Sequence, residues 1–144
     1  HPKLGITHVN LGSLYLETNK LNKAKSHLKS ALHIRESNLP SGHPDIAESH
    51  FWLAQLSIKQ NNNNDASSHF ETALKHYVKV LGAKHPKVGY IAIQLGDLKI
   101  KLNQPELAIS YFNSAKDIFK ILDIKEMEQY AKYQILICQE RHQI

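Results

Sequence analysis

Apolar and small side chains recur along the chain at intervals of three, four and seven residues, with polar positions between them. The first two such stripes are Leu11 with Leu14, and Ala24 with Leu28 and Ala31. These intervals are typical of amphipathic α-helices that bury one face. Gly12 lies within the first stripe and lets a second helix approach closely, so the two stripes are predicted to face each other in a helical hairpin.

The same pattern returns 42 residues later, and again after a further 42. The dipeptide His-Pro marks each unit, beginning at His1, His43 and His85. The same offset aligns further columns: Leu11, Leu53 and Leu95; Leu14, Leu56 and Leu98; Gly12, Ala54 and Gly96; Ala24, Ala66 and Ala108; Leu28, Phe70 and Phe112; Ala31, Ala73 and Ala115. One period kept through so many columns predicts an all-α array of tandem helical hairpins.

Residues that end and start helices follow the same period. Asn19, Asn61 and Asn103 share one column, and asparagine readily takes the left-handed conformation that terminates a helix. A proline follows each repeated histidine, at a position where the first turn of a helix tolerates the missing N–H, and Pro105 occupies an equivalent place. The predicted helices are 2–18, 21–38, 44–60, 63–80, 86–102, 105–121 and 125–142.

We therefore expect a single array over residues 1–144, with repeats at 1–42, 43–84 and 85–125 and a capping helix at 126–144. The last segment continues the period, because Ile137 and Cys138 fall 42 residues after Leu95 and Gly96. It is predicted to be the first helix of a fourth repeat, without the second helix of that repeat. Cys138 is expected in the buried small-residue column. The absence of an initiator methionine indicates a piece of a longer protein.

Composition narrows the class of protein. Hydrophobic residues make up 42% and charged residues 22%, which favours a folded chain. A single cysteine excludes an internal disulfide and favours a reducing, cytoplasmic setting, and no apolar run approaches the length of a membrane span. The net charge of +5 comes from scattered lysines, so nucleic-acid binding is only a third hypothesis, after an adaptor and a region of a larger enzyme.

The histidines and the motif content predict neither a metal site nor a catalytic site. Most of the ten histidines fall into repeat columns, as His8 with His50 and His27 with His69 do, so equivalent side chains are a whole repeat apart and no metal is expected. The sequence contains no glycine-rich phosphate loop, nucleophile elbow, HExxH motif or Cys–His pair. It therefore predicts no catalytic residue and no cofactor, and the chain is expected not to be an enzyme.

The columns resemble the tetratricopeptide repeat, whose signature matches LGSLY, Ala24, Leu28 and Ala31 in the first unit and the equivalent residues of the others. The 42-residue period and the junction ALHIRESNLPSGHPDIA are similar to the repeats of kinesin light chains and related cargo adaptors. This resemblance implies an alpha-alpha superhelix, a solenoid of three hairpins plus a capping helix. It also implies an adaptor that binds a peptide or helix of a partner protein in its concave groove.

Two features of that family are missing. Kinesin light chains carry paired asparagines on the first helix of each repeat, and only Asn10 matches one here. The carboxylate clamp of chaperone-binding tetratricopeptide domains needs Lys, Asn and Arg where this chain has Val9, Ser13, Tyr90 and Gln94. A receptor for chaperone tails is therefore not expected.

The predicted groove is the face of each first helix opposite its packing stripe. Its residues are Val9, Asn10, Ser13, Glu48, Phe51, Trp52, Gln55, Tyr90, Ile93, Gln94 and Asp97. Trp52 is rotated about 200° from His50 on a helix, so if His50 faces its second helix then Trp52 faces the groove or solvent. The alternative is that Phe51 and Trp52 only pack between adjacent helices.

The stretch HPKVGYIAIQLGDLKIKLNQPELAISYFNSAKDIFKI also resembles the helical C-terminal region of SET-and-MYND-type lysine methyltransferases. This second resemblance implies a regulatory or substrate-positioning region of a larger enzyme. Such a region would still hold no catalytic residue.

Overall fold

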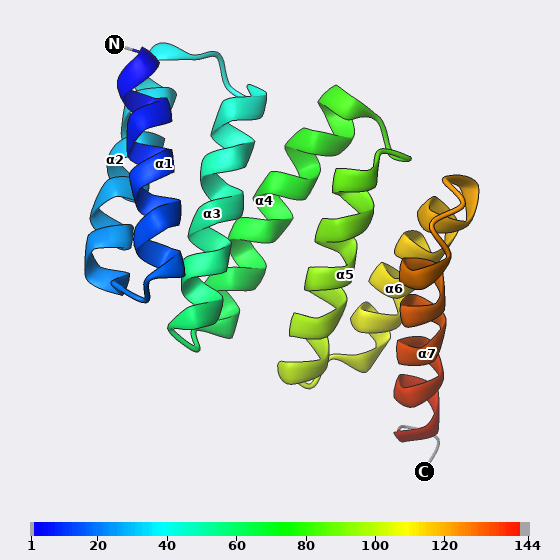
Figure 1. The fold of residues 1–144 in the computed structure, drawn as a ribbon. Helices are drawn as coiled ribbons and strands as arrows, with labels where there is room; N and C mark the ends of the chain where they lie inside the picture. Colours follow the sequence, from blue (N-terminus) through cyan, green and yellow to red (C-terminus); the bar gives the residue numbers. More distant parts are fainter. Residues whose placement is uncertain (1, 142–144) are drawn as a thin grey trace. The chain divides into compact units, whose positions relative to one another are not determined.

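A computed structural model describes residues 2–141 and contains seven α-helices and no strand over that range. The helices are α1 (Pro2–Glu17), α2 (Leu21–Asn38), α3 (Pro44–Lys59), α4 (Asn63–Leu81), α5 (Pro86–Lys101), α6 (Pro105–Ile121) and α7 (Lys125–Arg141) (Figure 1). The all-α class and the order of seven helices are confirmed, with every boundary within one residue of the sequence prediction. The chain divides into two compact units, His1–His76 and Tyr77–Ile144, and the division falls inside α4.

The turns within the hairpins share one geometry. Asn19, Asn61 and Asn103 have φ angles of 61°, 58° and 58°. After the first of them, the backbone N–H of Lys20 donates to the carbonyl oxygen of Tyr15 at 2.8 Å. This bond satisfies a carbonyl that the helix end would otherwise leave without a partner. The predicted left-handed asparagines are thus confirmed as the residues that reverse the chain.

The repeated His-Pro pair is a helix-capping motif. The Nδ1 atom of His43 accepts from the backbone N–H of Asp45 at 3.0 Å, and that of His85 accepts from Lys87 at 3.1 Å. The proline that follows each histidine occupies the first turn of α3 or α5. His1, the first member of the column, lies outside the described residues. The column therefore has a structural explanation in the first turns of these helices.

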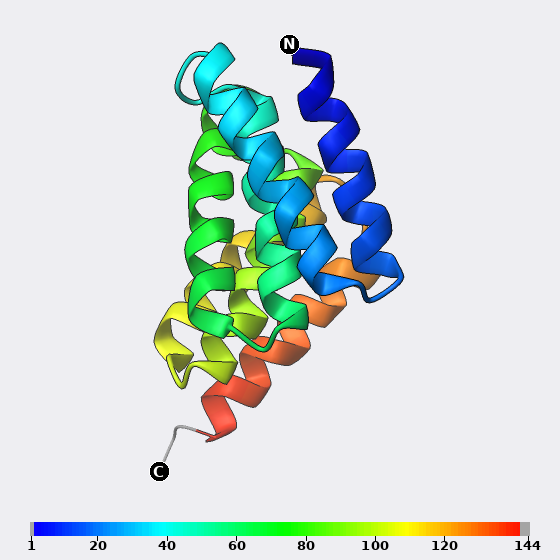
Figure 2. The ribbon, with the colours of Figure 1, turned by 90° about the vertical axis from the view of Figure 1, so that its left-hand side faces the viewer.

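In the first unit, α1 and α3 run in the same direction and α2 runs antiparallel to both (Figures 1 and 2). Their shared core contains Leu16, Ala24, Leu28, Leu53 and Leu56. The predicted small-residue column explains how closely the helices pack, because a Cβ atom built on Gly12 would lie 2.5 Å from Cδ2 of Leu28. This close packing of α1 on α2 fixes the position of the side chains that α1 and α3 present.

The second unit is built around buried aromatic residues of α6. Phe112 and Phe119 are fully buried, together with Ala108 and Ala115. Gly96 of α5 again provides room, since a Cβ atom there would lie 2.6 Å from Cε1 of Phe112. Most members of the columns that the sequence assigned to packing are therefore buried in both units. Leu14 is an exception, because it is 53% exposed whereas its equivalents Leu56 and Leu98 are buried.

The burial pattern of the last helix agrees with the predicted 42-residue register. In that register Ala131, Ile135 and Cys138 are equivalent to Gly5, Val9 and Gly12 of α1, and all six residues are buried. Tyr133 is 63% exposed, and its equivalent in α1, Thr7, is exposed as well. Cys138 therefore lies in the buried small-residue column.

The turn that precedes α7 is shorter than the junctions before α3 and α5. Only residues 122–124 join α6 to α7, whereas residues 39–43 and 82–85 form the junctions before α3 and α5. Asp123 has a φ of 57°, and the N–H of Ile124 donates to the carbonyl of Phe119 at 2.9 Å. This is the same turn that closes each hairpin, so α7 follows α6 as a hairpin partner.

Candidate functional site

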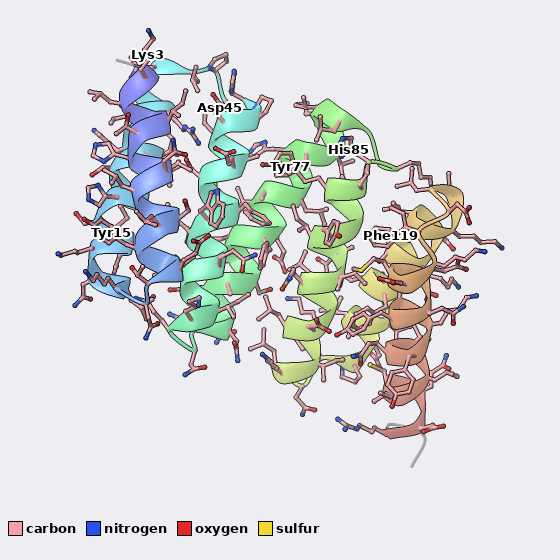
Figure 3. All side chains as sticks on the ribbon, in the orientation of Figure 1. Lys3, Tyr15, Asp45, Tyr77, His85 and Phe119 are labelled. Atoms are coloured by element: carbon pink, nitrogen blue, oxygen red, sulfur yellow. The ribbon has the colours of Figure 1, made fainter. Side chains whose placement is uncertain are left out.

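An open pocket of about 340 Å³ lies in the first unit, between α1, α2 and α3. Its lining residues are Ile6, Val9, Asn10, Ser13, Arg35, Asp45, Glu48 and Trp52. Five of these, Val9, Asn10, Ser13, Glu48 and Trp52, were predicted as groove residues. In Figure 3, Asp45 lies at the first turn of α3, at the same end of the unit as Lys3 of α1. Five of the seven groove residues predicted in the first two repeats thus line one pocket, and Phe51 and Gln55 do not.

Arg35 of α2 forms a buried, charged part of this pocket, and sequence reasoning missed it. Its side chain is only 4% exposed. Its Nη1 atom donates to the carbonyl of Asp45 at 2.8 Å, to Oε1 of Glu48 at 3.1 Å and to Oγ of Ser49 at 3.1 Å. These three acceptors on α3 hold the guanidinium in place, and the Glu48 carboxylate compensates its charge.

A glycine on α1 makes room for this side chain. A Cβ atom built on Gly5 would lie 3.2 Å from both Cγ and Nε of Arg35. In the third repeat, Gly89 stands against Phe119 in the same way, with its Cβ position 2.8 Å from Cζ. Arg35 therefore occupies a packing position that holds an aromatic side chain, Tyr77 or Phe119, in the other two repeats.

Trp52 has a mixed environment. It lines the pocket and also packs against the core of the first unit, with partial burial. Phe51 lies edge-on to Trp52, with ring centroids 5.5 Å apart, and also edge-on to Phe70 of α4 at 5.8 Å. Phe51 is therefore held by its own hairpin, whereas Trp52 presents part of its indole to the pocket. Gln55 is partly exposed but does not line this pocket.

Two predicted groove residues are buried instead. Val9 and Ile93 are each 5% exposed, and Ile93 packs with the core that surrounds Phe112. The sequence-based interpretation set both on the open face because they lie opposite the main packing stripe. Each helix in fact buries more than one stripe, since it contacts neighbours on two sides. These two side chains consequently offer little surface to a partner.

The predicted groove residues of the second unit have different surroundings. Tyr90 is 52% exposed and lies edge-on to Phe119, and Gln94 is partly exposed. Asp97 accepts hydrogen bonds from the Tyr130 hydroxyl of α7, at 2.9 Å to Oδ1 and 3.1 Å to Oδ2. Burial raises the pKa of Asp97, although the Tyr130 hydrogen bond opposes that rise. Part of the predicted face is therefore already engaged by the chain itself.

Histidines from two columns pair across the hairpins. The Nδ1 atoms of His8 and His27 lie 2.9 Å apart, and those of His50 and His69 lie 3.0 Å apart. The second pair confirms that His50 faces the second helix of its own repeat, so Trp52 points elsewhere. Burial, followed by the charges of His69 and His76, lowers the pKa of His50 to about 4.

The sequence-based prediction compared only equivalent histidines of successive repeats, so it missed these pairs within each repeat. A signal existed, because both pairs are separated by 19 residues. Among residues 2–141, no three His, Cys, Asp or Glu side chains are arranged to hold a metal ion. Over the same range, no helix is both long and apolar enough to cross a membrane.

Comparisons with known proteins agree with this geometry. Two tetratricopeptide repeat profiles match the chain, one over residues 45–121 and one over residues 9–45. No curated protein sequence matches it.

Several solved structures share the fold. BtubC (BKLC) from P. vanneervenii is 23% identical, with a TM-score of 0.78 over 97% of this chain and 57% of that one. The nearly identical TPR-like repeats of a Podosopora anserina protein described as a kinesin light chain are 17% identical, with a TM-score of 0.80 over 96% of this chain and 67% of that one. Aspartyl phosphate phosphatase F from Bacillus subtilis is 19% identical, with a TM-score of 0.78 over 97% of this chain and 36% of that one.

Identities this low establish the fold alone, and the chain spans 57% of the length of the BtubC structure. The profiles, however, cover most of the sequence, and one of them alone matches more than half of it. The chain therefore belongs to the tetratricopeptide repeat family.

Proposed function

We propose that the chain is an adaptor module that binds a peptide or helix of a partner protein, using the α1–α3 pocket as its main anchor site. Tetratricopeptide repeats are generally protein–protein interaction modules and are typically not enzymes. The proposal goes further, because it assigns the contact to particular side chains of the first unit.

The observation that carries the proposal is the position of Trp52. Its indole is part of the pocket wall, with Ile6 on the α1 side. Ile6 is 53% exposed, so the wall offers apolar surface that a partner side chain would remove from water. Partly buried tryptophans that line a pocket are typical anchors of binding energy at protein interfaces.

Polar groups in the same pocket as the Trp52 indole can orient a bound peptide. Asn10 is exposed, and its amide carries both a donor and an acceptor for a peptide backbone. The Ser13 hydroxyl donates to the Asn10 carbonyl at 3.0 Å and keeps its oxygen as an acceptor. An apolar wall with a few fixed polar groups is the usual composition of a peptide-binding pocket.

The single tryptophan gives a direct test. Peptides would be selected from a random display library with the whole chain as bait and then titrated against it. We expect the selected peptides to change the Trp52 fluorescence and to shift the backbone amide resonances of Asn10 and Ser13. Shifts confined to other helices, with unchanged fluorescence, would show that the chain binds peptides elsewhere. An outcome with no selected peptide would contradict the proposal itself.

A further inference from the structure

Arg35 breaks the pattern of its own repeat column. The equivalent positions hold Tyr77 and Phe119, which are 3% and 0% exposed, so an aromatic side chain fits this packing position. A buried guanidinium has a large desolvation cost that an aromatic ring avoids. A charge in an otherwise aromatic column therefore points to a role beyond packing.

The hydrogen bonds of Arg35 leave one edge of the guanidinium open. All of its bonds to described residues come from Nη1, so Nε and Nη2 have no partner among them. No buried side-chain nitrogen or oxygen of the described residues lacks a hydrogen-bond partner. It follows that Nε and Nη2 are reached by solvent, and Arg35 lines the pocket.

We infer that Arg35 binds a carboxylate of the partner peptide, from an acidic side chain or from the C-terminus, through its Nε–Nη2 edge. This inference rests on the proposed peptide-binding function and names the group that the pocket recognises. The two N–H groups of that edge are parallel and match the two oxygens of a carboxylate. The Nη1 contacts to α3 fix the orientation of the guanidinium in advance, which lowers the entropy cost of binding.

Glu48 acts as a built-in competitor in this arrangement. Its carboxylate is 3.1 Å from Nη1, and its side chain is 40% exposed, so it compensates the Arg35 charge from the mouth of the pocket. Asp45 is also half exposed, 3.9 Å from Nδ1 of His43. An incoming carboxylate must overcome repulsion from these acidic groups. Removing the Glu48 charge should therefore strengthen the binding of acidic peptides and weaken the binding of basic ones.

The chain contains two arginines, Arg35 and the exposed Arg141, so its spectrum of arginine Nε–H groups is simple to assign. The probes are four capped dipeptides: acetyl-Leu-Asp amide, acetyl-Leu-Asn amide, acetyl-Leu-Lys amide and acetyl-Leu-Leu with a free carboxyl terminus. The first and last separate a side-chain carboxylate from a terminal one. The Arg141 signal serves as an internal control for nonspecific attraction.

We expect the two carboxylate peptides to shift the Arg35 Nε–H signal. The one that binds more tightly identifies the source of the carboxylate, either an acidic side chain or the C-terminus. The asparagine peptide should bind about tenfold or more weakly, because it loses a charge-assisted pair. Glu48→Gln should tighten binding of both carboxylate peptides. Preferred binding of the lysine peptide, weakened by Glu48→Gln, would overturn the inference, and so would the absence of any Arg35 shift.

The control for folding is Arg35→Phe. It introduces the residue type that the third repeat has at this position, where Phe119 packs against Gly89. Phenylalanine should pack on Gly5 as Phe119 packs on Gly89, so the variant should melt at or above the temperature of the parent chain. It should lose the preference for Asp over Asn in the probe peptides. If Arg35→Phe binds peptides unchanged while Trp52→Ala does not, the carboxylate inference fails and the proposed function stands.

Discussion

The Nδ1 atom of His50 lies 3.0 Å from the Nδ1 atom of His69, across the hairpin of the second repeat. A hydrogen bond between two ring nitrogens needs one donor and one acceptor, so it cannot form when both rings are protonated. Two protonated rings would make both Nδ1 atoms donors and break the bond. The same arrangement occurs between His8 and His27 at 2.9 Å.

Stability should therefore depend on pH. Burial is the main cause that lowers the pKa of His50 to about 4; it also lowers that of His69, where Lys29 adds to the effect and Asp65 opposes it. Because the folded-state pKa values lie below the unfolded value of 6.5, the unfolded chain binds more protons as pH falls. We expect the free energy of unfolding in urea to be highest above about pH 7 and to fall between about pH 6.5 and pH 4.

His50→Ala with His69→Tyr is the matched control, because the third repeat carries Ala92 and Tyr111 at these positions. The double variant should lose part of the pH dependence. An unchanged pH dependence in the double variant would assign the effect to other groups.

Volume added at Gly96 should destabilise the second unit. A Cβ atom there would lie 2.6 Å from the Phe112 ring, which is fully buried and has no space to move into. We expect Gly96→Leu to lower the free energy of unfolding by about 1–3 kcal/mol, as overpacking does. Lys101→Leu, at an exposed position of the same helix, is the control and should have little effect in the same urea titration.

The packing of α7 can be tested with two adjacent residues. Ile135 is 9% exposed within the second core, whereas Leu136 is 56% exposed. Ile135→Ala should therefore cost about 2–5 kcal/mol, and Leu136→Ala should change stability by about 0.5 kcal/mol or less. Thermal melting of the two variants measures both. Equal losses would mean that α7 does not pack through the face described above.

Periodicity predicted most of the fold because the residues that end helices and the residues that pack them repeat together. Asn19, Asn61 and Asn103 each determine one turn through their own left-handed conformation, so each turn is encoded locally. Before α7 the left-handed residue is Asp123, which lies outside the asparagine column. A comparison confined to the 42-residue period does not detect a turn that occurs outside its column.

The candidate site was only partly predictable. The spacing of α1 and α3 identified Asn10, Ser13 and Trp52, because these side chains share the face opposite a packing stripe. Arg35 was missed, since it lies on the second helix and reaches the pocket through the space left by Gly5. The sequence did contain an indication, because Arg35 is the one charged residue in a column that otherwise holds the aromatic residues Tyr77 and Phe119. The bond from Tyr130 to Asp97 joins residues 33 positions apart and follows no repeat, so nothing in the sequence indicated it.

Binding of a partner peptide in the α1–α3 pocket can be tested with Trp52→Ala. Affinity for a selected peptide and the free energy of unfolding would be measured on the same protein, with Phe51→Ala alongside. Phe51 packs on Phe70, so its truncation should reduce stability more than binding. We expect Trp52→Ala to weaken peptide binding by about 2 kcal/mol or more, with a stability loss below the roughly 3–5 kcal/mol of a fully buried tryptophan. If Trp52→Ala instead lost as much stability as a core truncation and bound the peptide unchanged, the pocket would not be the binding site.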